Sequence, residues 1–297
     1  MEIFKIPFTA MACPCEVVVA STNKAEAQTL AQLAIDEVMR IETKYSRYRA
    51  DSIISKINSN SSKEAIRCDD ETWSLFEYAN TLFQASEGLF DITSGILRRV
   101  WNFKEKKRPS DDELAQVLPL IGWQDVVRED KKIFLPKSGM EIDFGGFGKE
   151  YAADRAASIL SHKGVRSGYV NLGGDMRVIG PKLDGQAWMI GIQDPRQKGS
   201  LIATIPVEAG GLATSGDYEK FFELDGKRYC HILNPKTGQP VSYWRSISVL
   251  SSFSVVSGNC TTIAMLKESS GQAYLESTGL RYLAIDQEGE IFIKKTH

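Results

Sequence analysis

The sequence predicts an α+β protein with mixed or antiparallel sheets flanked by helices. Segments with helical spacing dominate the first half of the chain, whereas short strand-like runs dominate the second. Regular alternation of strand and helix, which a doubly wound parallel sheet requires, is rare. The 297 residues, of which 42% are hydrophobic and 25% charged, can bury a core without disulfides or structural metals. We expect one domain over residues 1–297, with two intertwined subdomains as the alternative.

The first half of the chain carries the patterns of capped amphipathic helices. Asn23 followed by Glu26 predicts a capped start, and apolar residues then repeat every three or four positions as far as Tyr45. Asp69 or Asp70 opens the next helix in the same way. We expect helices at residues 23–45, from 69 or 70 to about 88, from 110, and from 152 to 164, with strands at 16–20 and 132–135. The charged stretch 104–108 is interpreted as a solvated loop.

The second half of the chain consists mainly of short strand-like runs. Runs rich in β-branched and aromatic residues predict strands at 169–172, 188–192, 202–207, 229–233 and 247–250. A helix is expected from about 259 to 268. A terminal hairpin is expected at 282–285 and 290–294, with its turn at 287–289.

The charge balance and the cysteine content exclude several function classes. Lys plus Arg number 36 and Asp plus Glu 38, so the net charge of −2 offers no basic surface for nucleic acid or an anionic membrane. No apolar run approaches about 18 residues, so we expect no membrane insertion. The start of the chain lacks a secretory pattern, and the odd number of cysteines, five, fits a reducing compartment, which together predict a cytoplasmic protein. Three histidines are too few for a His-rich metal site.

A glycine-rich segment, residues 143–149, lies between a predicted strand and a predicted helix. Its glycines let the backbone approach a ligand, and a helix N-terminus favours anions such as a phosphate, which Lys149 would also attract. The spacing fits neither the P-loop nor the dinucleotide fingerprint. Taken alone, the segment is equally consistent with a tight structural turn.

Five further motifs are candidates for a structural or a functional role. Residues 171–175 are either a ligand contact or a hairpin turn capped by its Asp, and residues 214–218 form a polar turn suited to a phosphate or ribose. His231 lies in an apolar strand before an Asn-Pro turn, where a structural histidine is the usual finding. Residues 257–262 open the last helix and either cap it or bind a phosphate or hard cation. Residues 13–15 have the C-x-C spacing, which we interpret as the start of a strand and not as a redox or zinc pair.

The order and spacing of these motifs resemble the ApbE family of FAD:protein FMN transferases over nearly the whole chain. The resemblance implies a T-fold-type α+β architecture. The matching stretches are residues 44–58, 88–97 with Trp101, 142–149 with 151–154, 171–175, 214–218, 231–238, and Thr262.

The resemblance implies a specific reaction. Members of the family bind FAD and a divalent cation, usually Mg²⁺, and transfer FMN to a Thr or Ser hydroxyl of a target flavoprotein while AMP leaves. Such a transfer needs charge neutralisation and in-line positioning more than a protein nucleophile. Two alternatives remain open, which are an FAD pyrophosphatase that releases FMN and AMP, and a non-catalytic FAD-binding or assembly paralogue.

The resemblance also assigns roles to individual residues. His231 matches the histidine important for transfer, which removes a proton from the acceptor or organises the metal and pyrophosphate. The metal is expected at the Gly146 carbonyl, at position 258 and at the Thr262 hydroxyl. The FAD contacts are expected at Met11, Tyr48, Leu89, Phe90, Asp91, Asp143, Lys149 and Ile232.

The chain departs from the family pattern at four places. Gly258 stands where the last motif usually has an Asp, four residues before the metal-ligand Thr, and Asn259 follows it. Glu150 stands where a Gly usually follows the Lys; it carries a charge of the missing sign, but the sequence does not place its side chain at the metal. Ala12-Cys13 replaces Gly-Thr, and Asn234 replaces an Asp. Since a hard cation prefers anionic oxygen, the loss of the Asp is expected to weaken Mg²⁺ binding.

Overall fold

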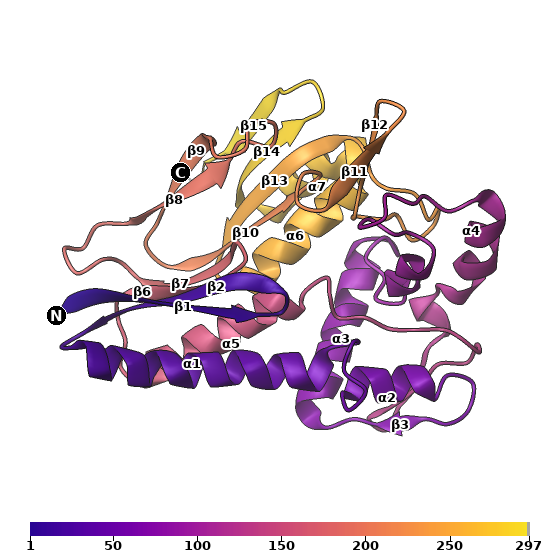
Figure 1. Ribbon diagram of the computed structural model, residues 1–297, viewed down its shortest axis with the longest axis horizontal. Helices are drawn as coiled ribbons and strands as arrows, with labels where there is room; N and C mark the ends of the chain where they lie inside the picture. Colours follow the sequence, from indigo (N-terminus) through magenta and orange to yellow (C-terminus); the bar gives the residue numbers. More distant parts are fainter. Residues whose placement is uncertain (296–297) are drawn as a thin grey trace.

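An eight-stranded antiparallel sheet is the central element of the fold (Figure 1). The computed structural model describes residues 1–295. All neighbouring strands in this sheet run antiparallel. In spatial order the strands are β1 (Glu2–Ala10), β2 (Cys13–Ser21), β6 (Gly168–Leu172), β7 (Asp175–Gly180), β10 (Gly210–Gly216), β13 (Trp244–Ser251), β14 (Arg281–Asp286) and β15 (Ile291–Lys294).

Helices cover one face of the sheet, so the predicted α+β class is confirmed. Figure 1 shows α1 and α5 side by side beneath the sheet, where α1 packs on β1 and β2 and α5 on β6 and β7, with α6 against β10 and β13. The α-helices are α1 (Lys24–Tyr45), α2 (Ile53–Ser59), α3 (Asp70–Ala85), α4 (Asp111–Val117), α5 (Gly148–His162), α6 (Ser254–Leu266) and α7 (Gly271–Thr278). Short 3₁₀ turns are η1 (Ser94–Arg99), η2 (Leu118–Leu120), η3 (Trp123–Asp125) and η4 (Glu268–Ser270). None of the helices within residues 1–295 is long and apolar enough to cross a membrane.

Three small sheets complete the structure. They are β3 (Ile66–Arg67) with β5 (Lys132–Phe134) and β4 (Val127–Glu129), β8 (Trp188–Gln193) with β9 (Leu201–Val207), and β11 (Phe221–Leu224) with β12 (Lys227–Cys230). The β8–β9 pair packs on β6 and β7, where Trp188 meets Tyr169 edge to face at 5.0 Å. The β11–β12 pair stacks Phe222 and Tyr229 beside Trp101. The cluster of Trp101, Phe222 and Tyr229 therefore packs the segment after η1 against the region that carries His231.

Most elements lie where the sequence predicted them. The N-caps Asn23, Asp69 and Ser110 accept hydrogen bonds from the first turns of α1, α3 and α4, and Ser110 with Glu113 forms a complete capping box. The terminal hairpin, the strand β2 and the exposed charged turn at 104–108 are also confirmed. Cys13 and Cys15 lie in β2 as predicted.

Several predictions for the second half of the chain were wrong. Strand β12 ends at Cys230, so His231 lies in the loop after it and not within a strand. Residues 214–216 belong to β10 and form no turn, because their backbone pairs with β13. Helix α6 begins at Ser254, which places residues 257–262 inside it and not at its start, and α7 follows it. The sequence analysis missed β1, whose Pro7 is tolerated because β1 is an edge strand, and the short helix α2.

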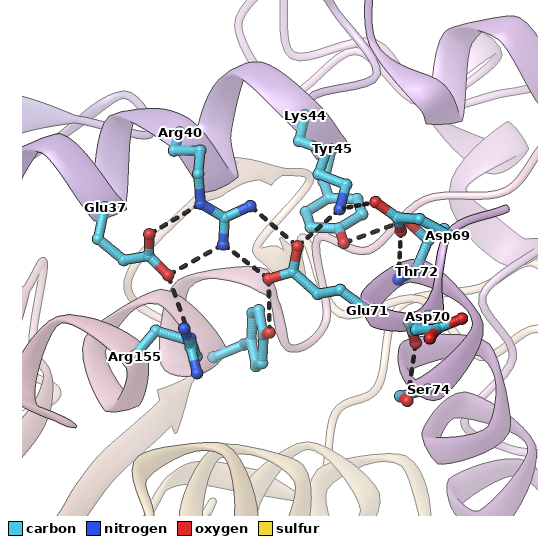
Figure 2. Close-up of polar contacts among 11 residues, drawn as sticks. Glu37, Arg40, Lys44, Tyr45, Asp69, Asp70, Glu71, Thr72, Ser74 and Arg155 are labelled. Carbon is cyan, nitrogen blue, oxygen red and sulfur yellow. Dashed lines mark hydrogen bonds and ion pairs between the residues drawn. The ribbon is translucent and has the colours of Figure 1, made fainter. Parts of the chain in front are cut away.

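A network of ion pairs joins α1, α3 and α5 (Figure 2). Glu37 of α1 accepts hydrogen bonds from Arg40 at 2.8 Å and from Arg155 of α5 at 3.1 Å. Glu71 at the start of α3 pairs with Arg40 at 2.7 Å and with Lys44 at 2.6 Å. Every carboxylate in this network has a cationic partner, so it fixes the three helices relative to one another.

Candidate active site

The glycine-rich segment is a tight loop held by two buried aromatic side chains. Phe144 and Phe147 lie in the main core, with ring centroids 4.8 Å apart. Asp143 Oδ1 accepts a hydrogen bond from the Gly145 amide at 2.9 Å, which closes the turn. A Cβ atom at Gly146 would lie 2.9 Å from the Phe90 ring, so only glycine fits there. The loop leads directly into the N-terminus of α5.

Lys149, in the first turn of α5, forms an ion pair with Asp175 at the start of β7. The Lys149 Nζ and Asp175 Oδ2 atoms are 2.5 Å apart, and Asp175 is buried. Burial alone would lower the pKa of Lys149, but the charge of Asp175 outweighs this and raises the pKa above its usual range. Residues 171–175 are thus the hairpin turn that one interpretation predicted, with left-handed φ at Gly173 and Gly174. Asp175 does not cap the turn; it holds the lysine cation.

Two arginines surround Asp143. The guanidinium of Arg47 lies 3.4 Å from Asp143 Oδ2 and donates a second bond of 2.8 Å to the Gly95 carbonyl. Arg98 approaches the same carboxylate oxygen at 3.8 Å. The loop that precedes α5 is therefore bordered by cations, which suits an anionic ligand.

His231 lies in the loop after β12, and its backbone amide donates to the Lys220 carbonyl at 2.9 Å. Its Nδ1 atom is buried and has no hydrogen-bond partner. Burial, together with the charges of Arg98, Lys220 and Lys149, lowers the pKa of His231 to about 4. The imidazole is therefore neutral at pH 7 and able to accept a proton.

Two hydrogen bonds bring the histidine loop to the segment after α3. Lys236 Nζ donates to the Glu87 carbonyl at 2.9 Å, and Trp101 Nε1 donates to the Gly238 carbonyl at 2.8 Å. Leu89 and Ile232 consequently pack against one hydrophobic cluster around Trp244. The two motifs, which lie more than a hundred residues apart in the sequence, form one surface.

Helix α6 presents Gly258 and Thr262 four residues apart, hence on one face. Ser215 of β10 lies beside this face, with its hydroxyl 2.8 Å from that of Thr261 and 3.4 Å from that of Thr262. Asn259 points elsewhere, because its amide nitrogen donates to the Tyr78 hydroxyl and to the Val255 carbonyl, each at 2.6 Å. Ser215 was not predicted as a site residue, although it belongs to the polar motif 214–218.

Glu150 occupies the space next to Gly258. A Cβ atom on Gly258 would lie 2.7 Å from Glu150 Cγ. The Oε2 atom of Glu150 is buried and has no hydrogen-bond partner. Burial, reinforced by the charge of Asp175, raises the pKa of Glu150 to about 8. The sequence showed the two departures from the family pattern but not that they touch.

The remaining predicted FAD contacts stay predictions. Met11 has a left-handed φ of 49° in the β1–β2 turn, and Tyr48 is 79% exposed beside the Arg47 guanidinium. Phe90 is buried against the glycine loop. The Asp91 carboxylate is buried and accepts bonds from the Thr93 and Trp123 amides and the Thr93 hydroxyl, so it holds its own segment in place.

Comparisons with known proteins identify the family. The model of the ApbE family matches residues 11–284. The chain belongs to the ApbE family. The FAD:protein FMN transferase of Vibrio cholerae is 31% identical over 271 residues, which cover 88% of this chain and 80% of that protein. The crystal structure of the ApbE protein of Thermotoga maritima superposes with a TM-score of 0.91 at 31% identity, over 99% of this chain and 97% of that one. The flavin transferase ApbE of Vibrio cholerae gives a TM-score of 0.88 at 25% identity, over 99% and 97% of the two chains.

Proposed function

We propose that the protein is an FAD:protein FMN transferase that moves FMN from FAD to a Thr or Ser hydroxyl of a target flavoprotein. The acceptor oxygen bonds to the phosphorus of FMN, the bond from this phosphorus to the bridging oxygen breaks, and AMP leaves with that oxygen. The family membership and the relatives named FAD:protein FMN transferase support this reaction. The observation that carries it in this chain is a buried, neutral histidine within the electrostatic influence of a lysine cation that Asp175 holds in place.

Lys149 is suited to hold the pyrophosphate of FAD. Its ion pair with buried Asp175 keeps it charged and fixes its position at the start of α5. The N-terminus of α5, which has no side-chain cap, adds the positive end of the helix dipole, which favours phosphate oxygens. Arg47 and Arg98 extend the positive surface around Asp143. Together these cations offset the negative charge that otherwise repels an incoming oxygen.

His231 is suited to accept the proton of the acceptor hydroxyl. Its imidazole is neutral at pH 7, and its Nδ1 has no partner within the described residues. The charge of Lys149 acts on its ring, so base and phosphate site are within electrostatic reach of each other. Binding the anionic pyrophosphate would raise the pKa of His231 towards neutrality and make it a stronger base.

We further propose that the reaction depends on Mg²⁺. Residues 1–295 contain no group of three or more His, Cys, Asp or Glu side chains that would hold a metal by themselves. The oxygen atoms available are the Gly146 carbonyl, the Thr262 hydroxyl and one buried carboxylate, that of Glu150, and Mg²⁺ prefers such hard donors together with substrate phosphates. The unpartnered oxygen of Glu150 fits a cation. When bound, Mg²⁺ would neutralise the charge of the pyrophosphate.

The test is mass spectrometry of an acceptor domain that carries a Ser/Thr-Gly-Ala-Thr-like motif, incubated with the protein, FAD and Mg²⁺. We expect a mass gain equal to a phosphoester-linked FMN together with release of AMP, and loss of both in His231→Ala. Release of FMN and AMP without any acceptor would show a pyrophosphatase instead. Intact FAD under all conditions would show a binding paralogue.

We also propose a cytoplasmic location. All five cysteines are free thiols, and the Cys13 and Cys15 sulfur atoms remain separate at 3.7 Å. A reducing compartment keeps thiols in this state. Cell fractionation should find the protein with cytoplasmic markers; recovery with periplasmic markers would overturn the proposal.

A further inference from the structure

Glu150 is exceptional among the buried acids of the described chain. The carboxylates of Asp91, Asp175 and Asp217 each receive hydrogen bonds or ion pairs from neighbouring groups. Glu150 is 7% exposed, and its Oε2 atom has no such partner. A buried carboxylate without a partner is costly, so it is retained where a ligand completes it.

The nearest cation does not supply the missing partner. Lys149 precedes Glu150, but its ammonium group is bonded to Asp175 at 2.5 Å. Asn259, on the other side of Gly258, has its amide nitrogen committed to Tyr78 and Val255. The free oxygen of Glu150 therefore remains available to a positively charged ligand.

The register between α5 and α6 places the Glu150 side chain against Gly258. Asp154 of α5 accepts hydrogen bonds from the Ser254 and Val255 amides at 2.9 Å each and so caps α6. One turn earlier on α5, Glu150 lies against Gly258, one turn later on α6. The two helices thus run antiparallel here, and Gly258 shares its face of α6 with Thr262 one turn later.

We propose that Glu150 supplies the anionic ligand of the divalent cation from α5, and that Gly258 is a glycine because this carboxylate occupies the space its side chain would need. The family pattern has the reverse arrangement, with a carboxylate at the position of Gly258 and a glycine at that of Glu150. The inference rests on the proposed function for the presence of the cation. The metal-ligand carboxylate has in effect moved from one helix to its neighbour.

Steric and charge arguments both require that a carboxylate at one of the two positions, 150 or 258, be accompanied by a glycine or another small neutral residue at the other. A side chain at position 258 would overlap Glu150, whose Cγ and Cδ atoms lie 2.7 Å and 2.8 Å from the place of a Cβ atom. Two carboxylates in this one space would also repel each other. Either carboxylate alone fits.

The experiment measures Mn²⁺ binding, as a probe of the divalent site, by electron paramagnetic resonance of the FAD-loaded protein. We expect Glu150→Gln to weaken Mn²⁺ binding at least tenfold, since the amide keeps the shape but loses the charge. Glu219→Gln is the matched control, because Glu219 is an exposed acid whose charge acts on the same Lys149. It should bind Mn²⁺ within about twofold of the wild type. Unchanged Mn²⁺ affinity in Glu150→Gln would overturn the proposal.

A relocation experiment separates ligation from simple disruption of the site. Gly258→Asp alone should fail to improve Mn²⁺ affinity, whereas Glu150→Gly combined with Gly258→Asp should restore it to within about threefold of the wild type. Flavin fluorescence quenching without metal should show unchanged FAD affinity in Glu150→Gln, which confirms an intact pocket. A double variant that binds Mn²⁺ no better than Glu150→Gln would contradict the exchange.

The outcome is distinguishable from failure of the proposed function. Mn²⁺ binding that depends on Glu150, without any transfer of FMN to an acceptor, would refute the transferase and leave the ligand assignment standing. Transfer that proceeds with Mg²⁺ at full rate in Glu150→Gln would support the transferase and refute the ligand assignment.

Discussion

The carboxylates that lie on the two sides of helix α5, Glu71 of α3 and Glu150 of α5 itself, are in opposite states. Towards α1 and α3, Arg155 and the Tyr151 hydroxyl complete the network of Figure 2, in which Glu71 accepts four hydrogen bonds from three residues. Hydrogen bonds from Arg40 and the neighbouring cation of Lys44 hold the pKa of Glu71 well below its usual range. Towards α6, Glu150 keeps one oxygen without a donor, and burial raises its pKa to about 8.

This difference separates a structural carboxylate from one that awaits a ligand. A saturated network stabilises the folded chain and needs nothing further. An unpartnered buried group costs free energy in the absence of its ligand, and such groups concentrate at functional sites. His231 Nδ1 meets the same criterion, as do single atoms of Ser167, Arg245, Ser246, Ser254 and Asn259, so the criterion carries weight only together with the place of a residue in the site. Burial by itself would not have distinguished these residues from Asp91.

The largest effect is expected on the unpartnered histidine. His231→Ala should lower the rate of FMN transfer by about 100-fold or more, which is the usual contribution of a general base. The free energy of unfolding should change little, because the imidazole Nδ1 makes no hydrogen bond. Transfer assays and urea denaturation on the same preparation check this. A variant that retains the wild-type rate would remove His231 from the reaction.

The second-largest effect is expected on the stability of the ion-pair network between α1, α3 and α5. Glu71→Ala should lower the free energy of unfolding by about 2 kcal/mol, since it leaves Arg40 and Lys44 without their shared partner in a partly exposed setting. Metal affinity should stay as in the wild type. Urea denaturation measures the first quantity and Mn²⁺ binding the second. An equal loss of Mn²⁺ binding would show that the two sides of α5 are not independent.

Low pH should remove the difference in the free energy of unfolding between the wild type and Glu71→Ala. The pKa of Glu71 is depressed in the folded state, so its stabilisation is present above the unfolded pKa of about 4.3 and is lost as the pH falls below it. The difference between wild type and Glu71→Ala should therefore shrink from about 2 kcal/mol at pH 7 as the pH falls below about 4.3, and vanish only below the depressed folded-state pKa of Glu71. Urea titrations across this range measure it. A constant difference would mean that the charge of Glu71 contributes nothing.

The smallest effect is expected for Glu150 in the metal-free protein. Glu150→Gln should raise the free energy of unfolding of the metal-free protein by about 1 kcal/mol at pH 8, because a neutral amide is less costly to bury than a carboxylate without a partner. The sign is opposite to that of Glu71→Ala. Urea denaturation in the presence of a chelator measures it, and a destabilisation of similar size to that of Glu71→Ala would place Glu150 in the structural class.

The sequence predicted local structure well where local interactions decide it. The caps at Asn23, Asp69 and Ser110 and the periodic apolar positions of α1 and α3 required no distant contact. The predictions failed where contacts with distant segments of the same chain determine the local structure. The start of α6 lies earlier than predicted because Asp154, a hundred residues before it, caps it. Residues 214–216 read as a turn, but β13 pairs with them and makes them a strand.

The sequence by itself determined the family motifs, the α+β class and the identities of Lys149, His231 and Thr262 as candidate site residues. It also contained both departures, Glu150 and Gly258, as separate facts. Only the tertiary structure decided that these two residues touch, because the contact depends on the antiparallel register of α5 and α6. Likewise, only packing decided that Asp175 would hold the lysine while the oxygen of Glu150 stayed free. A charge pattern along a chain gives the sign of each group, whereas its partner and its burial follow from the fold.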